Sequence, residues 1–415
     1  MLKKISVADL QLGMHLHALE GAWFSHPLWR SKFLLSAEAD LHAIRASGVR
    51  HCWIDSSKGL DVATPVTEAA PIDPVERALT QPAPLLDLPD PRDAVPEPSA
   101  EFEDELVRAA RLCRSSKQAV QTLFADIRMG KALHAADFQP LVEELAASVF
   151  RNPGALVSLA RLKTKDDYSY MHSVAVCALM IALARELGMG GQACREAGLA
   201  GLLHDVGKAV MPIELLNKPG KLTDAEFTVM RSHPVRGHAL LAESGGAGSA
   251  ALDVCLHHHE RIDGSGYPHA LAAGAITQMA RMGAICDVYD AISSTRPYKS
   301  AWDPADSISR MASWQGHFDP TLLAVFVRSL GIYPTGSLVR MHSGRLAVVI
   351  RQNPKALTAP VVKVFYSTQT EQPITVAQID LSRPDAHDAI LAREPRGAWN
   401  FPQLETLWAG EAAQR

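Results

Sequence analysis

The segment 257–268, HHHERIDGSGYP, places three consecutive histidines beside a carboxylate, an arginine and a turn bracketed by two glycines. Neighbouring histidines, with carboxylates elsewhere in the chain, are what a metal site needs. A second segment, LLHDVGKAV at 202–210, puts a histidine and an aspartate side by side on an apolar helix. A neutral imidazole next to a hard anion allows one carboxylate to bridge two cations. The chain is therefore expected to fold around a metal centre.

Composition places the chain among globular proteins of more than one domain. Its 415 residues are too many for one ordinary core, and 47% hydrophobic with 21% charged residues is typical of a soluble protein. A net charge of −4 argues against a nucleic-acid polymer as partner. The six cysteines form no CxxC pair, which indicates reduced thiols. No signal peptide is evident, and the apolar run at 174–184 is too short to span a bilayer, so we expect a cytoplasmic protein without a membrane segment.

Changes in pattern along the chain predict five segments. They are a small N-terminal α+β domain (1–63), a linker rich in proline, alanine and acidic residues (64–100), a helical connector (101–150), a helical catalytic domain (151–331), and a small C-terminal β-containing extension (332–415). The predicted fold class is mainly α, with small β-containing units at both ends.

Two of these segments could make contacts beyond the catalytic domain. The connector carries an apolar stripe through Leu106, Leu112, Val120, Leu123 and Ile127. Packing on the next domain is the first interpretation of this stripe, and homodimerisation is the second. The aromatic cluster at 23–29, WFSHPLW, is expected to be core or an intramolecular contact surface and not a ligand pocket.

The candidate metal ligands gain weight as a set. A single histidine on an apolar helix is usually structural, and the same interpretation applies to the N-terminal histidines 15, 17 and 26. Burying many imidazoles and carboxylates is costly unless something binds them. A mixed imidazole and carboxylate set without thiolate suits Fe, Mn, Zn or Ni. Two such ions would polarise a phosphoryl group and generate hydroxide at neutral pH. The candidates are His172, His204, Asp205, His233, Asp287 and two of the histidines 257–259.

These motifs together resemble the HD-GYP family, a branch of the HD phosphohydrolase superfamily. The resemblance covers about 168–333 and includes, in family order, LLHDVGKAVMP, NKPGKLTDAE, MRSHPVRG, HHERIDGSGYP and CDVYDAISSTRPYKSA. The N-terminal region is also similar to a small domain often found before HD-GYP domains. The resemblance implies an HD-type helical bundle and a cyclic di-GMP phosphodiesterase that forms linear pGpG and, in some members, GMP.

The resemblance also implies a ligand set. One metal would take His172, His204, Asp205 and Asp287, and the other Asp205, His233, His258 and His259. The family motif HHE-R-x-DG-x-GYP makes Glu260 fix the register, so His257 is the extra, structural histidine. Fe or Mn is the first expectation for the two divalent ions, with Ni, Co or Zn as alternatives.

Catalytic and substrate contacts are implied in the same way. Asp205 and Lys208 are expected to be catalytic, with Lys208 reaching a non-bridging phosphate oxygen. Arg296 and Lys299 would grip phosphate as a planar fork and a point charge. Gly264 and Gly266 would permit a close backbone approach, and Tyr267 and Pro268 would shape a guanine-binding wall. Asp263 is expected to be a structural hydrogen-bonding residue.

One departure from the family pattern concerns a third metal. Some members bind it with a glutamate one helical turn before the first histidine, where this chain has Tyr168, a poor ligand. Asp166 or Asp167 could substitute only at an irregular start of the helix. The sequence therefore predicts a two-metal site.

Two alternatives to an active cyclic di-GMP hydrolase stay open. One is a phosphohydrolase for another nucleotide, against which the GYP loop and the Arg-Pro-Tyr-Lys segment argue. The other is a sensor that binds cyclic di-GMP with weak or no turnover. Such a sensor would signal to a protein partner through the N-terminal domain or the connector helices.

Overall fold

The computed structural model describes residues 2–19, 33–46, 51–60, 100–163, 168–218, 220–294, 301–353 and 355–413, and the chain divides into two compact units, 1–77 and 78–415. Several expectations from the sequence concern other residues. Outside the described residues lie the aromatic cluster with His26, nearly all of the proline-rich linker, Asp166, Asp167, Arg296 and Lys299, and also the side chain of Tyr168.

Unit 1 is a small α+β fold. Its strands are β1 (Leu2–Ser6), β2 (His15–Leu19), β3 (Phe33–Leu34) and β4 (His51–Asp55), which pair antiparallel in the order β1-β4-β2-β3. A 3-10 turn, η1 (Val7–Asp9), follows β1, and the helix α1 (Glu38–Ala46) precedes β4. Ile44 of α1 is buried in one core with Leu16 of β2 and Ile54 of β4, so the helix packs on the sheet.

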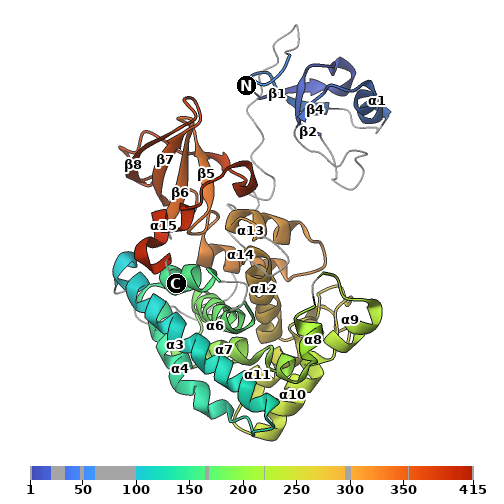
Figure 1. Ribbon diagram of the computed structural model, residues 1–415, viewed down its shortest axis with the longest axis vertical. Helices are drawn as coiled ribbons and strands as arrows, with labels where there is room; N and C mark the ends of the chain where they lie inside the picture. The colour runs from blue at the N-terminus through green and yellow to red at the C-terminus, as the bar shows by residue number, and fades with distance from the viewer. Residues whose placement is uncertain are drawn as a thin grey trace. The chain divides into compact units, whose positions relative to one another are not determined.

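Unit 2 is a helical bundle with a β sheet at its C-terminal end, which confirms the predicted fold class (Figure 1). Its helices are α3 (Phe102–Arg128), α4 (Gln139–Arg151), α5 (Pro153–Ala160), α6 (Tyr168–Glu186), α7 (Gly191–Leu203), α8 (Ile213–Leu216), α9 (Asp224–Met230), α10 (His233–Ser244), α11 (Gly248–His257), α12 (Gln278–Ser293), α13 (Pro304–Ser313), α14 (Pro320–Leu330) and α15 (Leu404–Ala409).

Helices α6 and α7 pack closely in the interior of the bundle. Every residue of α6 from 174 to 184 is buried, which explains why this helix is apolar on all sides. On α7, a Cβ added to Gly201 would lie 2.9 Å from the carbonyl oxygen of Val176. Glycine therefore allows the two helix backbones to approach, and the end of α7 comes to lie beside the start of α6.

The connector helix α3 packs on the bundle and does not stand apart from it. Its apolar stripe is buried or half-buried against α5 and α6, in the same core as the catalytic helices. The first of the two interpretations of the stripe is therefore what the structure shows. In Figure 1, α3 and α4 cover one side of the bundle, and α8 and α9 form an excursion at another edge.

The C-terminal extension forms an antiparallel sheet, as its period-two pattern predicts. Its strands are β5 (Leu338–Met341), β6 (Arg345–Arg351), β7 (Val361–Ser367), β8 (Gln372–Asp380) and β9 (Ile390–Arg393), in the order β8-β7-β6-β5-β9. Leu338, Val348 and Trp408 of this region belong to the same core as the helices. The sheet therefore supports the bundle, and none of the predicted metal or substrate residues lies in it.

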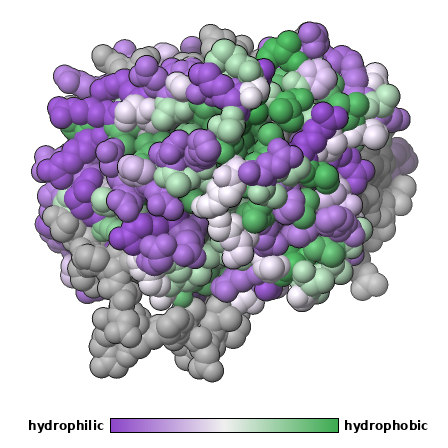
Figure 2. Space-filling view, turned by 90° about the horizontal axis from the view of Figure 1, so that it is seen from below, coloured by the Kyte–Doolittle hydropathy of each residue, from purple (hydrophilic) through white to green (hydrophobic). Residues whose placement is uncertain are grey.

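The described helices include none that combines the length and apolar character needed to cross a membrane. One face of the molecule, in Figure 2, carries hydrophilic residues over most of its left part and has hydrophobic residues interspersed toward the right.

Candidate metal centre

Five helices bring the predicted ligands to one place. The ligands are His172 in the first turns of α6, His204 and Asp205 directly after α7, His233 at the start of α10, His258 and His259 directly after α11, and Asp287 within α12. All seven residues fall into three groups that could each hold a metal ion, with the ligand atoms of a group within 4.8 Å of one another. The groups are His172, His204 and Asp287; His204, Asp205 and His258; and His233, His258 and His259.

The structure modifies one expectation about the His-Asp dipeptide. Helix α7 ends at Leu203, so the dipeptide stands at the end of the helix and not within it. Asp205 leaves the helical conformation (φ −102°, ψ 10°) before the 3-10 turn η5 (Val206–Val210). The chain turns because Gly207 lies against α10, where an added Cβ would be 2.0 Å from the carbonyl oxygen of His233. The turn brings Asp205 close to His233.

Asp205 lies between two sets of imidazoles. Its Oδ1 is 3.2 Å from His233 Nε2 and 3.7 Å from His258 Nε2. Its Oδ2 is 3.3 Å from His204 Nε2 and 3.6 Å from His172 Nε2. One carboxylate therefore presents each of its oxygens to a different pair of ring nitrogens, as a carboxylate that bridges two cations must.

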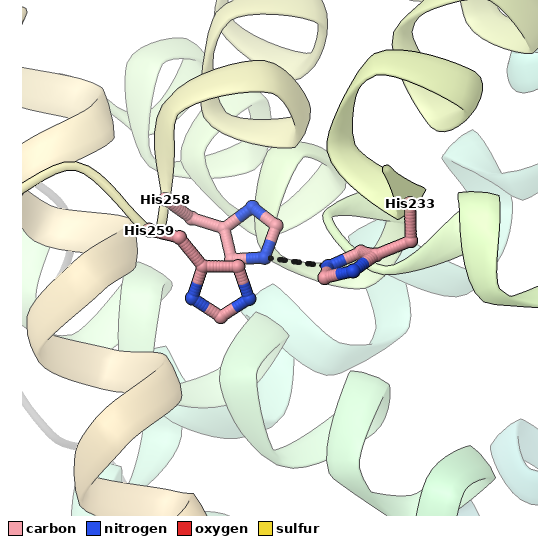
Figure 3. A group of neighbouring side chains, drawn as sticks. All are labelled: His233, His258 and His259. Carbon is pink, nitrogen blue, oxygen red and sulfur yellow. Dashed lines mark hydrogen bonds between the residues drawn. The ribbon is translucent and has the colours of Figure 1, made fainter. Parts of the chain in front are cut away.

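Asp287 and His259 lie next to these two pairs of imidazoles. Asp287 Oδ1 lies 2.9 Å from His172 Nε2 and 3.9 Å from His204 Nε2, and its Oδ2 lies 3.8 Å from His259 Nδ1. In Figure 3, His258 and His259 project from one segment toward His233, with 3.4 Å between the Nε2 atoms of His233 and His258. Two imidazole nitrogens this close that both present lone pairs are suited to a shared cation.

Backbone carbonyls orient several of the imidazoles. The Nδ1 atoms of His204, His233 and His258 lie 2.7, 2.8 and 2.9 Å from the carbonyl oxygens of Gly201, Met230 and Val254. An Nδ1–H that donates to a carbonyl leaves the lone pair of Nε2 free for a metal. The local helical geometry thus sets the tautomer that a ligand needs.

Unsatisfied buried atoms support a cation at this place. His204 Nε2 and Asp205 Oδ1 are buried and make no hydrogen bond with the rest of the described chain. Burial lowers the pKa of His204, but attraction to Asp205 outweighs it and raises that pKa, so positive charge is favoured beside this carboxylate. A divalent ion would satisfy both atoms, and the residues present therefore fit one.

The pKa values of His258, His259 and the two carboxylates favour the states that metal binding requires. Burial lowers the pKa of His258 to about 4 and that of His259 well below its usual value, so both imidazoles are neutral at pH 7. Burial opposes ionisation of Asp205, yet the neighbouring Lys208 charge outweighs it and holds the Asp205 pKa well below its usual range. Burial would raise the pKa of Asp287, but a hydrogen bond with His172 outweighs it and holds that pKa well below its usual range. Neutral imidazoles and ionised carboxylates are the forms that bind divalent ions.

The GYP loop lies against this cluster. The ring of Tyr267 stacks on that of His259 at 4.7 Å and 29°. A Cβ added to Gly266 would lie 2.5 Å from Glu260 Cα, so the loop closes only with glycine there, and the Tyr267–Pro268 peptide is cis. The buried Glu260 carboxylate accepts hydrogen bonds from two backbone N–H groups of the loop.

His257 and Asp263, both expected to be structural, make hydrogen bonds outside the metal groups. His257 bonds through Nδ1 to Asp253 at 2.8 Å and through Nε2 to His269 at 3.1 Å, and it belongs to none of the three groups. Asp263 accepts a hydrogen bond from the Ser265 N–H at 2.9 Å, which helps form the turn at Gly264, whose φ is +77°.

Sequence reasoning missed two residues behind His172. Asp290 Oδ2 lies 2.6 Å from His172 Nδ1 and also bonds to the fully buried Lys163 amine. A carboxylate in this position orients a metal-ligating histidine. The sequence held a signal for Asp290, because this residue follows Asp287 by three positions and so lies on the same face of α12. The sequence held no signal for the pairing with Lys163, because that pairing depends on where the segment after α5 lies relative to α12.

Comparisons with known proteins identify the family of the chain. A model of the "HD domain" matches residues 141–322, and a "Domain of unknown function (DUF3391)" matches 2–138. The chain is 51% identical to the cyclic di-GMP phosphodiesterase PA4108 of Pseudomonas aeruginosa, over 99% of this chain and 97% of that protein. It is 40% identical to the cyclic di-GMP phosphodiesterase response regulator RpfG of Xanthomonas campestris, over 35% of this chain and 39% of that protein. It is 35% identical to the 3'3'-cGAMP-specific phosphodiesterase 1 of Vibrio cholerae, over 40% of this chain and 38% of that protein.

The helical fold, the His-Asp dipeptide and the matched model define an HD-domain hydrolase, a class that binds divalent metal ions. Within this class the chain belongs to the HD-GYP family, in an architecture with the DUF3391 domain in front of the catalytic domain.

Proposed function

We propose that this chain is a phosphodiesterase that opens cyclic di-GMP to linear pGpG, with GMP as a further product. The observation that carries the proposal is the two-sided environment of Asp205, whose oxygens face different pairs of imidazoles. The relative named cyclic di-GMP phosphodiesterase supports the substrate, because its likeness to this chain extends over nearly the full length of both. By this reaction the protein would lower a second messenger in the bacterial cytoplasm.

In this proposal Asp205 would help to hold both of two divalent ions. His172, His204 and Asp287 would hold one, and His233, His258 and His259 the other, a division supported by the distances around the two Asp205 oxygens. We propose Fe or Mn, with Ni, Co or Zn as alternatives, because imidazole and carboxylate ligands without thiolate suit these metals.

The chain's own residues would bind the substrate and neutralise its charge. When bound, the ions polarise the phosphoryl group and lower the pKa of a water molecule. Lys208 Nζ lies 2.5 Å from Asp205 Oδ2 and its side chain is 27% exposed, so it can also reach a non-bridging oxygen of a phosphate. Lys208 would thereby offset negative charge that develops on that oxygen.

The other substrate contacts come from the GYP loop and from the segment after α12. Tyr267 and Pro268 would form a wall for a guanine, and Gly264 and Gly266 would let the loop backbone approach the ligand. Arg296 and Lys299 would grip phosphate. Support for the loop's part is its position, with Tyr267 stacked on the proposed ligand His259.

We also propose that the catalytic domain spans 151–331, with the segments before and after it as its frame. The shared core of α3, the bundle and the C-terminal sheet supports this division of labour. Homodimerisation, and a signalling partner on the N-terminal unit or the connector, stay predictions.

The decisive experiment measures product formation from cyclic di-GMP. The protein is purified anaerobically and reconstituted separately with Fe(II) and with Mn(II), beside an Asp205→Ala variant. We expect turnover by the wild type and a loss of at least about 10³-fold in the variant, because the shared ligand of both ions is gone. The ratio of pGpG to GMP shows how far hydrolysis proceeds.

Other outcomes would identify the alternatives. Metal-loaded wild type that binds cyclic di-GMP without forming product is a sensor. Turnover of another nucleotide alone makes the protein a different HD phosphohydrolase. Either result would overturn the proposed function.

A further inference from the structure

Arg231 lies at the junction of α9 and α10, two residues before His233. Its guanidinium carbon stands 4.5 Å from the centre of the Tyr267 ring, on which it lies, and 6.0 Å from the centre of the Phe227 ring. Tyr267 in turn stacks on His259. The cation therefore ends a stacked series that starts at the proposed metal centre.

The hydrogen-bonding groups of Arg231 are available to a ligand. Its side chain is exposed, and among the described residues it has neither a carboxylate partner nor a hydrogen-bond acceptor. A guanidinium held on an aromatic ring keeps its N–H groups at the edge, where they can form two parallel hydrogen bonds. Beside it Phe227 is 49% exposed, an unusual position for a large aromatic side chain. An exposed ring next to an unpaired fork of donors suits a planar base with acceptors on one edge.

We propose that Arg231 is a specificity-determining residue that binds the O6 and N7 atoms of one guanine of the substrate, an inference that rests on the proposed function. Guanine presents two acceptors on this edge, whereas adenine presents N7 and an N6 amino donor that would oppose the guanidinium N–H groups. A base held by the guanidinium would also lie next to the Tyr267 ring and could extend the stack.

A base explains this position better than a phosphate does. A phosphate next to the proposed metal centre would already have a cation beside it, Lys208, whose amine lies at Asp205. Arg231 instead stands on the aromatic side of the GYP loop, with two rings beside it. Relatives of this chain carry names for cyclic di-GMP and for 3'3'-cGAMP, two substrates that differ in one base. A residue that discriminates between them has to contact the edge of a base.

The test compares cyclic di-GMP, 3'3'-cGAMP and cyclic di-AMP as substrates of wild type, Arg231→Gln and Arg231→Lys. For cyclic di-GMP we expect KM to rise about 5- to 100-fold in both variants, because one bidentate base contact is lost, with kcat much less affected. For cyclic di-AMP the rise in KM is smaller, so the preference for guanine falls by the ratio of the two rises. Arg231→Lys keeps the charge but not the fork, and it therefore separates base recognition from simple attraction.

Arg236 provides the matched control. It is exposed on α10 and lies on no aromatic ring of the described chain, so Arg236→Gln removes the same charge without the stack. We expect it to leave the substrate preference unchanged. Equal losses on all three dinucleotides in Arg231→Gln, with recovery in Arg231→Lys, would show a phosphate contact and overturn the inference, as would unchanged kinetics.

Failure of the proposed function can be told apart from failure of this inference. If the wild type turns over none of the dinucleotides, the proposed function is wrong, and the ratio of Kd values for cyclic di-GMP and cyclic di-AMP then tests Arg231 by itself. A ratio that is the same in wild type and Arg231→Gln would overturn the inference in that case too. So would wild type that binds neither dinucleotide.

Discussion

At the scale of single residues, the site depends on which nitrogen of each histidine faces inward. Three Nδ1 atoms are held by carbonyls of their own helical turns, whereas that of His172 is held by the Asp290 carboxylate. Burial opposes the ionisation of Asp290, but the Lys163 charge outweighs it and lowers the Asp290 pKa. The ionised carboxylate accepts a hydrogen bond from Nδ1–H of His172 and so leaves Nε2 facing the site. Asp290 is thus a positioning residue behind the proposed metal ligand.

Replacement of Asp290 should therefore weaken metal binding without removing a ligand. For Asp290→Asn we expect metal affinity to fall about 10- to 100-fold, because an amide can present its N–H₂ group to His172 and oppose the required tautomer. Metal titration by calorimetry measures the effect. Asp253→Asn is the matched control, because Asp253 makes the same contact with His257, which lies outside the metal groups. Equal affinity in Asp290→Asn and wild type would show that the carboxylate does not act through His172.

At the scale of secondary-structure elements, the site depends on how closely η5 approaches α10. Gly207 of the turn and Gly237 of the helix face each other, and a Cβ on Gly237 would lie 2.9 Å from Gly207 N and 2.6 Å from Cys255 Sγ. This contact joins the turn that carries Asp205 to the helix that carries His233. The 3.2 Å between Asp205 Oδ1 and His233 Nε2 follows from two backbones that have no side chain between them.

A methyl group at Gly207 should separate the two elements. An added Cβ would stand 2.0 Å from the carbonyl oxygen of His233, so α10 must move. For Gly207→Ala we expect a loss of about 1–3 kcal/mol in unfolding free energy and weaker metal binding, both from overpacking. Thermal melting and metal titration check this. Gly190→Ala, at the start of α7, is the control because its Cβ would meet nothing within 4 Å. Equal stability of the two variants would mean that the approach of η5 to α10 is not tight.

At the scale of the whole molecule, the ligand residues of the site could be predicted from the sequence better than the residues that hold them in position. The resemblance to the HD-GYP family implied the seven residues that come together, and the family motif, with its register at Glu260, separated His258 and His259 from His257. Chain spacing could not show that α7 stops before His204, because that depends on the packing of Gly207 against α10. It also could not place Lys163 behind Asp290 or Arg231 on Tyr267. Those contacts join segments far apart in the sequence, and tertiary packing alone decides them.

The helices that carry the proposed ligands should be stabilised together when metal binds. The ions would connect α6, α7, α10, α11 and α12, and such ligands are not assembled in the unfolded chain. At a free metal concentration about a hundredfold above Kd, binding adds about 3 kcal/mol to the unfolding free energy. This corresponds to a rise of roughly 4 °C in Tm for a unit of this size. Calorimetry of the full chain, with metal and with chelator, measures the shift.

The two compact units supply an internal control for this measurement. The three metal groups found in the described chain all lie in unit 2, so the transition of unit 1 should not respond to the chelator. In Asp205→Ala the shift of unit 2 should largely disappear, because that variant lacks the shared ligand. A Tm that is independent of metal in the wild type, or a shift of equal size in Asp205→Ala, would contradict a metal centre built on this carboxylate. In the expected case, the metal that serves the reaction also holds together the five helices that form the site.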